Sequence, residues 1–237
     1  MRIAVAIVTA GRPAILAETI AELTRQHRQP DRLLVCCPDA DDAPNLPPGA
    51  ELLLAPRGLA VQRNRVLDAV ADCDLVVFFD DDFLPAPAWL QRIEALFAEH
   101  EAIVVATGIA PAPNGYGCNM ALRLAPMRQH QLRFDEALPL YGWFEDVDLT
   151  RRLGAFGRIV RDDSARGVHL GVKLARGPGV RTGYSRVANP VYLARKGSCP
   201  PRMALRSILR NLSANLALAA WPEPWVDRRG RLAPGRI

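Results

Sequence analysis

The segment LVVFFDDDFLP, residues 75–85, changes abruptly from apolar to acidic. Its first five residues hold no polar side chain, and three consecutive carboxylates follow, Asp80, Asp81 and Asp82. An apolar run of this length predicts a strand buried on both faces of a parallel sheet. Ligands of open α/β sheets bind at the carboxyl ends of such strands, so the acidic triplet marks a candidate site.

Three adjacent carboxylates at one strand end repel one another unless a cation offsets their charge. Oxygen ligands of this kind suit Mg²⁺ or Mn²⁺, held by one or two carboxylates together with the phosphates of a substrate. A solvated acidic turn is the alternative, and it is the commoner explanation of an arbitrary DDD. The position directly after a buried strand favours the metal site.

The first half of the chain alternates strand and helix patterns. Strands are predicted over residues 2–9, 32–37 and 51–54. Helices are predicted over residues 13–26 and 59–70. Together with the strand before the acidic triplet, the order is β-α-β-loop-β-α-β, which predicts a parallel, doubly wound half.

Each predicted strand of this half is followed by a polar cluster. The clusters are residues 9–12, 39–42, 57–64 and 80–82. Because the carboxyl ends of parallel strands share one edge of a sheet, these clusters should form a nucleotide-sized site. No Gly-x-Gly-x-x-Gly follows the first strand and no Walker loop occurs, which argues against dinucleotide and P-loop ATPase sites.

The second half begins after a Gly- and Pro-rich loop at residues 110–117. Before this loop, a helix from Pro87 and a strand over residues 102–109 are predicted. After it, a helix is predicted to begin at residue 144 or 145 and to stop before residue 157. Glu145 and Asp146 fall in its first turn, where capping by acidic side chains is the alternative to a catalytic role.

The C-terminal part, residues 198–237, is predicted as one long helix over 203–220 and an irregular tail. Residues 184–196 also have a helical pattern, except for Pro190. The long helix places Ile208, Leu212 and Leu216 on one face and Arg206 and Arg210 elsewhere, and basic amphipathic helices of this kind can lie on a membrane surface. Docking of this helix onto its own domain is the commoner outcome, and we favour it.

The composition is that of a globular protein of 237 residues with a formal net charge of +5. Arginine carries nearly all of the positive charge, and phosphorylated ligands or anionic lipid would suit it, so it does not by itself indicate nucleic-acid binding. The five cysteines form no C-x-x-C pair, which indicates reduced thiols in the cytosol. The N-terminus predicts a strand rather than a signal peptide, and we expect no membrane span.

Several short motifs are recognisable together through their order and spacing. They are VTAGRP, PDADD, GLAVQRN, FFDDDF, CNMALR and FDEALPLYGWFEDVDL, followed by a downstream histidine. In this order they resemble the family 2 glycosyltransferases of the GT-A fold, from the first strand to about residue 197. The resemblance implies an α/β fold with a Rossmann-like mixed, mainly parallel central sheet flanked by helices, and a C-terminal helical extension. It further implies a single domain, 1–197, with a nucleotide-binding half, 1–109, and an acceptor half, 110–197.

The resemblance also implies roles for individual residues. The nucleotide-sugar would be bound by Thr9, Ala10, Gly11, Arg12, Asp39, Arg63, Asn64, Asp80 and Asp81. A Mn²⁺ or Mg²⁺ cofactor would be held by Asp80, Asp82 and His169. Asp146 would be the catalytic base, with Glu145 assisting at the acceptor. Tyr141 and Trp143 could stack on an acceptor sugar, or they could belong to the core.

The implied reaction is one in-line displacement at the anomeric carbon of a nucleotide-sugar, which inverts the configuration. The acceptor would be a hydroxyl of a glycan, a glycolipid or a small molecule, and no nucleic acid would be bound. The enzyme would be cytoplasmic, either free or peripheral on the inner membrane face.

Two alternatives stay open. A sugar-phosphate nucleotidyltransferase would begin with a Gly-Gly-x-x-x-Arg loop, which VTAGRPA lacks, and an inactive scaffold would not need its carboxylates intact. Two departures from the family pattern leave the base and the acceptor open. The acidic loop lacks the usual Gly-Ser pair, and Trp143 and Phe144 replace the commoner glycine before Glu145.

Overall fold

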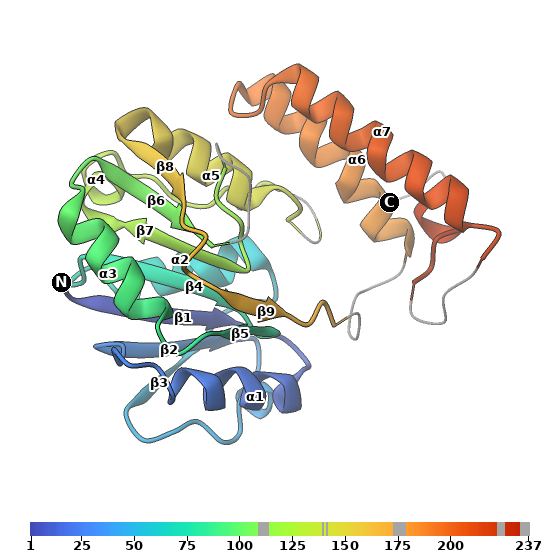
Figure 1. Ribbon diagram of the computed structural model, residues 1–237. Coiled ribbons are helices and arrows are strands. Elements are labelled where there is room, and N and C mark those ends of the chain that lie inside the picture. Colours follow the sequence, from blue (N-terminus) through green and yellow to red (C-terminus); the bar gives the residue numbers. More distant parts are fainter. Residues whose placement is uncertain (109–113, 139, 141, 173–178, 222–225, 233–237) are drawn as a thin grey trace.

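The apolar run before the acidic triplet forms β4 (Leu75–Asp80), with every apolar residue buried. The computed structural model describes residues 1–108, 114–138, 140, 142–172, 179–221 and 226–232. In it, β4 is the middle strand of a seven-stranded sheet of order β3-β2-β1-β4-β7-β6-β8. Helices cover the sheet, and two long C-terminal helices lie beside it (Figure 1). The predicted α/β fold with a C-terminal helical extension is therefore confirmed.

The first half is built from parallel strands, as predicted. Its elements are β1 (Ile3–Val8), α1 (Pro13–Leu23), β2 (Arg32–Cys37), η1 (Ala40–Asp42), β3 (Ala50–Leu54) and α2 (Leu59–Ala69). β1 pairs in parallel with β2 and β4, and β2 pairs in parallel with β3. The carboxyl ends of β1, β2 and β4 therefore lie on one edge of the sheet.

The elements after β4 add one strand that runs opposite to the others of the central sheet. These elements are β5 (Phe83–Pro85), α3 (Trp89–Glu99), β6 (Ile103–Thr107), β7 (Asn119–Arg123), α4 (Leu124–Gln129), α5 (Glu145–Leu153), η2 (Gly154–Phe156), β8 (Arg158–Arg161) and β9 (Gly167–His169). β7 is antiparallel to β4 and β6, whereas β6 and β8 are parallel. Since β7 runs opposite to β4, the start of β7 lies at the same sheet edge as the acidic triplet. The helix expected from Pro87 begins two residues later, after a turn closed by the Trp89 N–H on the Ala86 carbonyl.

Side chains of the central strands alternate between two buried layers. In β1, the odd-numbered residues Ile3, Val5 and Ile7 pack with side chains of α1 and α3. The even-numbered residues of β1 and β4 pack with side chains of α2, α4 and α5 on the other face. This alternation follows from the two-residue period of a strand, and burial of both faces explains why these strands are continuously apolar.

The C-terminal extension is a helical hairpin of α6 (Gly179–Lys196) and α7 (Pro201–Leu218), with η3 (Gly230–Leu232) packed against both. α6 runs through Pro190, which the sequence pattern had marked as an interruption. The predicted boundary at residue 197 falls between these two helices, which pack together (Figure 1). None of the helices in the described part of the chain has the length and hydropathy of a membrane span.

Candidate active site at the carboxyl edge of the sheet

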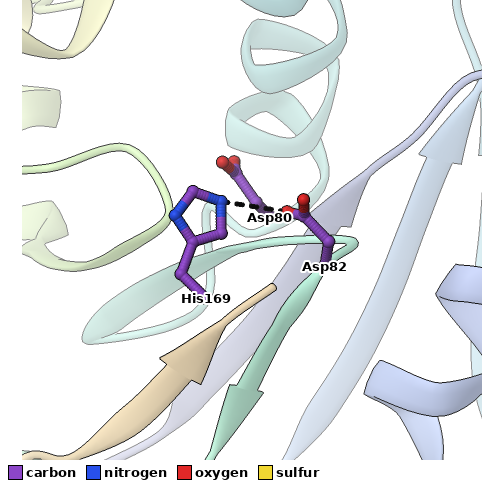
Figure 2. Close-up of side chains that lie close together, drawn as sticks. All are labelled: Asp80, Asp82 and His169. Atoms are coloured by element: carbon purple, nitrogen blue, oxygen red, sulfur yellow. Dashed lines mark hydrogen bonds and ion pairs between the residues drawn. The ribbon is translucent and has the colours of Figure 1, made fainter. Parts of the chain in front are cut away.

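A possible metal site lies at the end of β4. Asp80, Asp82 and His169 each offer one ligand atom, and these three atoms lie within 4.8 Å of one another. The His169 Nε2 is 3.1 Å from the Asp82 Oδ1. Figure 2 shows the imidazole facing the Asp82 carboxylate, with the Asp80 carboxylate beside the ring. His169 reaches the triplet because β9 pairs antiparallel with β5, which places His169 opposite Phe83. The three residues predicted as metal ligands are thus brought together.

The charges of the two carboxylates suit a cation. Burial alone would raise the pKa of Asp82, but hydrogen bonds from His169 and the Val172 N–H hold it below its usual value. Burial raises the pKa of Asp80, and the carboxylate of Asp82 raises it further, while Arg63 opposes both. A divalent cation would offset both the cost of burying these charges and the repulsion between them. Two carboxylates and one imidazole are a chemically suitable set of ligands for such a cation.

The middle aspartate of the triplet has different partners. Asp81 is fully buried and accepts hydrogen bonds from the Thr9 hydroxyl (2.6 Å) and from Nε (3.0 Å) and Nη2 of Arg12. Burial raises the pKa of Asp81 to about 6, although the Thr9 and Arg12 contacts lower it. Arg12 also lies 3.8 Å from Asp82, so this guanidinium ties the loop after β1 to the candidate metal site.

The loops after β1 and β2 are joined to each other. The Gly11 N–H donates to the Asp42 Oδ1 at 2.7 Å, and Gly11 has a φ of +72°, a conformation that favours glycine. Asp39 accepts the Asp41 N–H and so caps η1. The loops of residues 9–12 and 39–42, which were predicted to bind the nucleotide, are therefore hydrogen-bonded to each other at the sheet edge, next to Asp80.

Arg63 lies between the candidate metal site and α5. Its side chain is 1% exposed and donates from Nη1 to Glu145 and from Nη2 to the Gly117 carbonyl at 2.9 Å. The same Nη2 is 3.4 Å from the Asp80 Oδ1. Its guanidinium is also 5.4 Å from the ring centroids of Phe78 and Phe134. One buried cation therefore connects the carboxylates of the two halves.

Asp146 and Glu145 stand in the first turn of α5. The Asp146 Oδ2 accepts the Gly117 N–H at 2.8 Å. Burial raises the pKa of Asp146, while that hydrogen bond and Arg63 oppose the rise. Burial and the neighbouring Asp146 carboxylate raise the pKa of Glu145 as well, with Arg63 opposing both. Asp146 also raises the pKa of Asp80, so the two acidic clusters are close enough to interact electrostatically.

Two further predicted residues, Asn64 and Trp143, have other surroundings. Asn64 is buried and bonds the backbone of Phe134 and the side chain of Glu136. Trp143 is half-buried, with the Arg186 guanidinium 4.8 Å from its ring. Tyr141 lies outside the described residues. The nucleotide and acceptor roles assigned to these residues stay predictions.

Sequence reasoning missed the contribution of the loop that precedes β7. Its Gly117 links Arg63 and Asp146 through backbone groups, and the ring of Tyr116 is 6.3 Å from that of His169. Burial raises the pKa of Tyr116 to about 12, and the carboxylates of both acidic clusters add to the rise. The loop, NGYG, gave only a turn signal, because its place at the site depends on the reversed direction of β7.

The chain is similar in fold to solved glycosyltransferases. Mannosyltransferase PcManGT from Pyrobaculum calidifontis, in complex with GDP-Man and Mn²⁺, matches with a TM-score of 0.65 at 16% identity, over 98% of this chain and 78% of that one. S. aureus TarS 1–349 in complex with UDP-GlcNAc matches with a TM-score of 0.57 at 15% identity, over 82% of this chain and 67% of that one. At such identities the likeness concerns the fold alone.

Sequence comparison gives the family. No curated protein matches the chain. The family profile described as Glycosyl transferase family 2 matches residues 4–140, which is more than half of the sequence. The match runs from the second residue of β1 to beyond β7 and contains the acidic triplet. This chain therefore belongs to glycosyl transferase family 2.

Proposed function

We propose that this protein is a metal-dependent, inverting glycosyltransferase that moves a sugar from a nucleotide-sugar to an acceptor hydroxyl. The observation that carries the proposal is Arg63, which bonds Asp80 on one side and Glu145, beside Asp146, on the other. An in-line displacement needs charge stabilisation at the departing diphosphate and a proton acceptor on the opposite side of the sugar. Two acidic clusters held around one buried guanidinium would meet both needs.

Asp80, Asp82 and His169 would hold the cation, Mn²⁺ or Mg²⁺. The lowered pKa keeps Asp82 ionised and ready to coordinate. When bound, a divalent cation stabilises the negative charge that develops on the diphosphate, typically by several kcal/mol. The Mn²⁺ and GDP-Man of PcManGT, a protein of similar fold, support this assignment.

The donor would lie along the loops that follow β1, β2 and β4. The loop of residues 9–12 is fixed from two sides, by Asp42 at Gly11 and by Asp81 at Arg12. Because the loop is already held in place, its backbone groups could bind the nucleotide with little entropic cost of ordering. Both structural neighbours carry nucleotide-sugars, GDP-Man and UDP-GlcNAc, which supports a donor of this chemical class.

Asp146 would take the proton from the acceptor hydroxyl as it attacks. A positioned carboxylate typically contributes about 10²- to 10⁴-fold to such a step, most when its pKa lies near the working pH. Burial raises the pKa of Asp146 above its ordinary value, which brings it toward neutral pH. The Gly117 N–H orients one of the carboxylate oxygens of Asp146. Glu145, held by Arg63, would fix the first turn of α5 beside the acceptor.

The acceptor would bind on the second half, with Trp143 and Tyr141 as candidate stacking partners. Its hydroxyl would belong to a glycan, a lipid-linked sugar or a small molecule. The protein would act in the cytoplasm, either free or peripheral on the inner face of the membrane.

A thermal-shift panel tests donor and metal together. UDP-, GDP- and dTDP-sugars are each added with and without Mn²⁺, and we expect one nucleotide class to raise Tm only when Mn²⁺ is present. Asp82→Asn should lose this shift, whereas Asp163→Asn, a matched change at an exposed carboxylate, should keep it. No shift with any donor would favour an inactive scaffold.

Product analysis tests the chemistry. Asp146→Asn should keep the Mn²⁺-dependent Tm shift and stop sugar transfer, because only the base is lost. The wild-type protein should release a nucleoside diphosphate and form a product of inverted configuration. Transfer at the normal rate by Asp146→Asn would reject the base assignment. Release of pyrophosphate from a nucleoside triphosphate supplied together with a sugar 1-phosphate would identify a nucleotidyltransferase instead.

A further inference from the structure

The α6–α7 hairpin has an unusual distribution of charge. Residues 179–221, from the start of α6 to the end of the turn after α7, contain seven basic residues and no acidic one. The basic residues are Arg181, Arg186, Arg195, Lys196, Arg202, Arg206 and Arg210. The rest of the chain, with 23 basic and 25 acidic residues by difference from the totals of 30 and 25, is nearly balanced. The net positive charge of the protein therefore comes from this hairpin.

α7 also exposes its leucines. Of its 18 residues, the buried ones are Ala204 and Asn215, whereas Leu205, Leu209 and Leu216 are 57%, 57% and 64% exposed. Their spacing of four and seven residues places these leucines on one stripe of the helix. A surface helix of a globular domain normally turns such a stripe toward the core. Within the described part of the chain, the stripe on α7 is instead exposed.

Arginines run beside the leucine stripe. Arg202, Arg206 and Arg210 repeat every four residues, and their row lies about 80° around the helix from the leucines, at about 100° per residue. Trp221, which follows α7, is 72% exposed. Leucines and an interfacial Trp flanked by a row of cations are the pattern of a helix that lies in the plane of an anionic lipid surface.

We propose that the α6–α7 hairpin docks on an anionic phospholipid bilayer through the leucine stripe and arginine row of α7. Charge complementarity favours this occupant over a second copy of the chain. A second copy on the same face would bring its arginine row, Arg202, Arg206 and Arg210, close to the row of the first copy, whereas an anionic surface attracts each of these arginines.

The hairpin is fixed to the part of the chain that carries the proposed base. Lys196 contacts Asp135 (2.6 Å) and Asp148 (3.0 Å), and Arg151 donates to the Ser198 carbonyl at 2.9 Å. α5 would therefore be held near the bilayer when the hairpin docks. Resting on the proposed function, this geometry would suit an acceptor hydroxyl carried by a lipid.

Vesicle flotation of the full chain tests the docking without donor or metal. We expect wild-type protein to float with vesicles of equal parts phosphatidylglycerol and phosphatidylcholine and to stay behind with pure phosphatidylcholine. Replacing Arg202, Arg206 and Arg210 together with Gln should weaken partitioning by on the order of 100-fold, at about fivefold per arginine. Replacing Leu205, Leu209 and Leu216 together with Ser should also weaken it, on the order of 100-fold.

The matched control removes the same charge elsewhere. Arg25, Arg92 and Arg158 are exposed and lie outside the hairpin, so their joint replacement with Gln should leave flotation near wild type. Equal loss in this control, or no flotation of wild-type protein at low salt, would overturn the proposal. So would a dimer in sedimentation velocity that the leucine variant dissociates without any vesicle binding. Because donor binding and sugar transfer are measured separately, failure here leaves the proposed transferase activity untouched.

Discussion

Removal of the Arg63 guanidinium tests whether one buried cation holds the two acidic clusters together. Arg63→Met keeps an unbranched side chain but leaves Glu145 without its ionic partner. Breaking a buried pair by removing one partner costs about 3–5 kcal/mol. Loss of the cation–π contacts with Phe78 and Phe134 adds about 1–2 kcal/mol. For a protein of this size, the Tm should fall by on the order of 10–25 °C.

A double-mutant cycle followed by circular dichroism measures the coupling. Glu145→Gln in the Arg63→Met background removes the unpaired charge, so the double variant should lose at least about 1 kcal/mol less than the two single losses combined. Arg133→Met is the control, because its pair with Asp68 is about half exposed and is worth at most about 1 kcal/mol. Additive losses, or equal melting of Arg63→Met and Arg133→Met, would refute the reasoning.

Two further predictions concern the metal and the base. Gly167→Ala should weaken Mn²⁺ binding without changing a proposed ligand, because a Cβ there would lie 2.2 Å from the Phe83 Cζ and would push β9, with His169, away from β5. Calorimetric titration with Mn²⁺ checks this, and an unchanged affinity would contradict it. The acid limb of kcat/KM should lie above about pH 4, the ordinary aspartate range, because burial raises the pKa of Asp146 and a base works only when ionised. The rate should therefore fall as the pH drops through that raised pKa, and a pH–rate profile with its limb at or below pH 4 would speak against Asp146 as the base.

Local patterns were sufficient for the sheet and for one side of the site. Residues 75–79 are all apolar because both faces of β4 are covered. The sequence alone therefore predicts that this strand is buried. The parallel order of β1, β2 and β4 then follows from chain connectivity, which brings their polar ends to one edge. The motif resemblance supplied His169 and Asp146, which no local pattern could connect to the triplet.

Tertiary constraints decided the features that the sequence did not predict. Phe144 adopts a φ of +77° directly before α5, a left-handed conformation that costs a bulky residue about 1–2 kcal/mol and that local preference would exclude. Pro190 lies inside α6 rather than at its end. The position of Arg63 between two carboxylates depends on the reversal of β7, which brings Gly117 to the sheet edge. Each of these features depends on contacts between distant segments.

The shared guanidinium has a consequence for engineering. Since Arg63 lies in residues 1–109 and Glu145 in residues 110–197, these two segments cannot be exchanged independently. A chimera that borrows residues 110–197 from a relative to obtain a new acceptor preference must import a carboxylate at the matching place. Without that carboxylate, the Arg63 guanidinium would be buried without its partner on α5. The chimera would then fail to fold before its acceptor specificity could be measured.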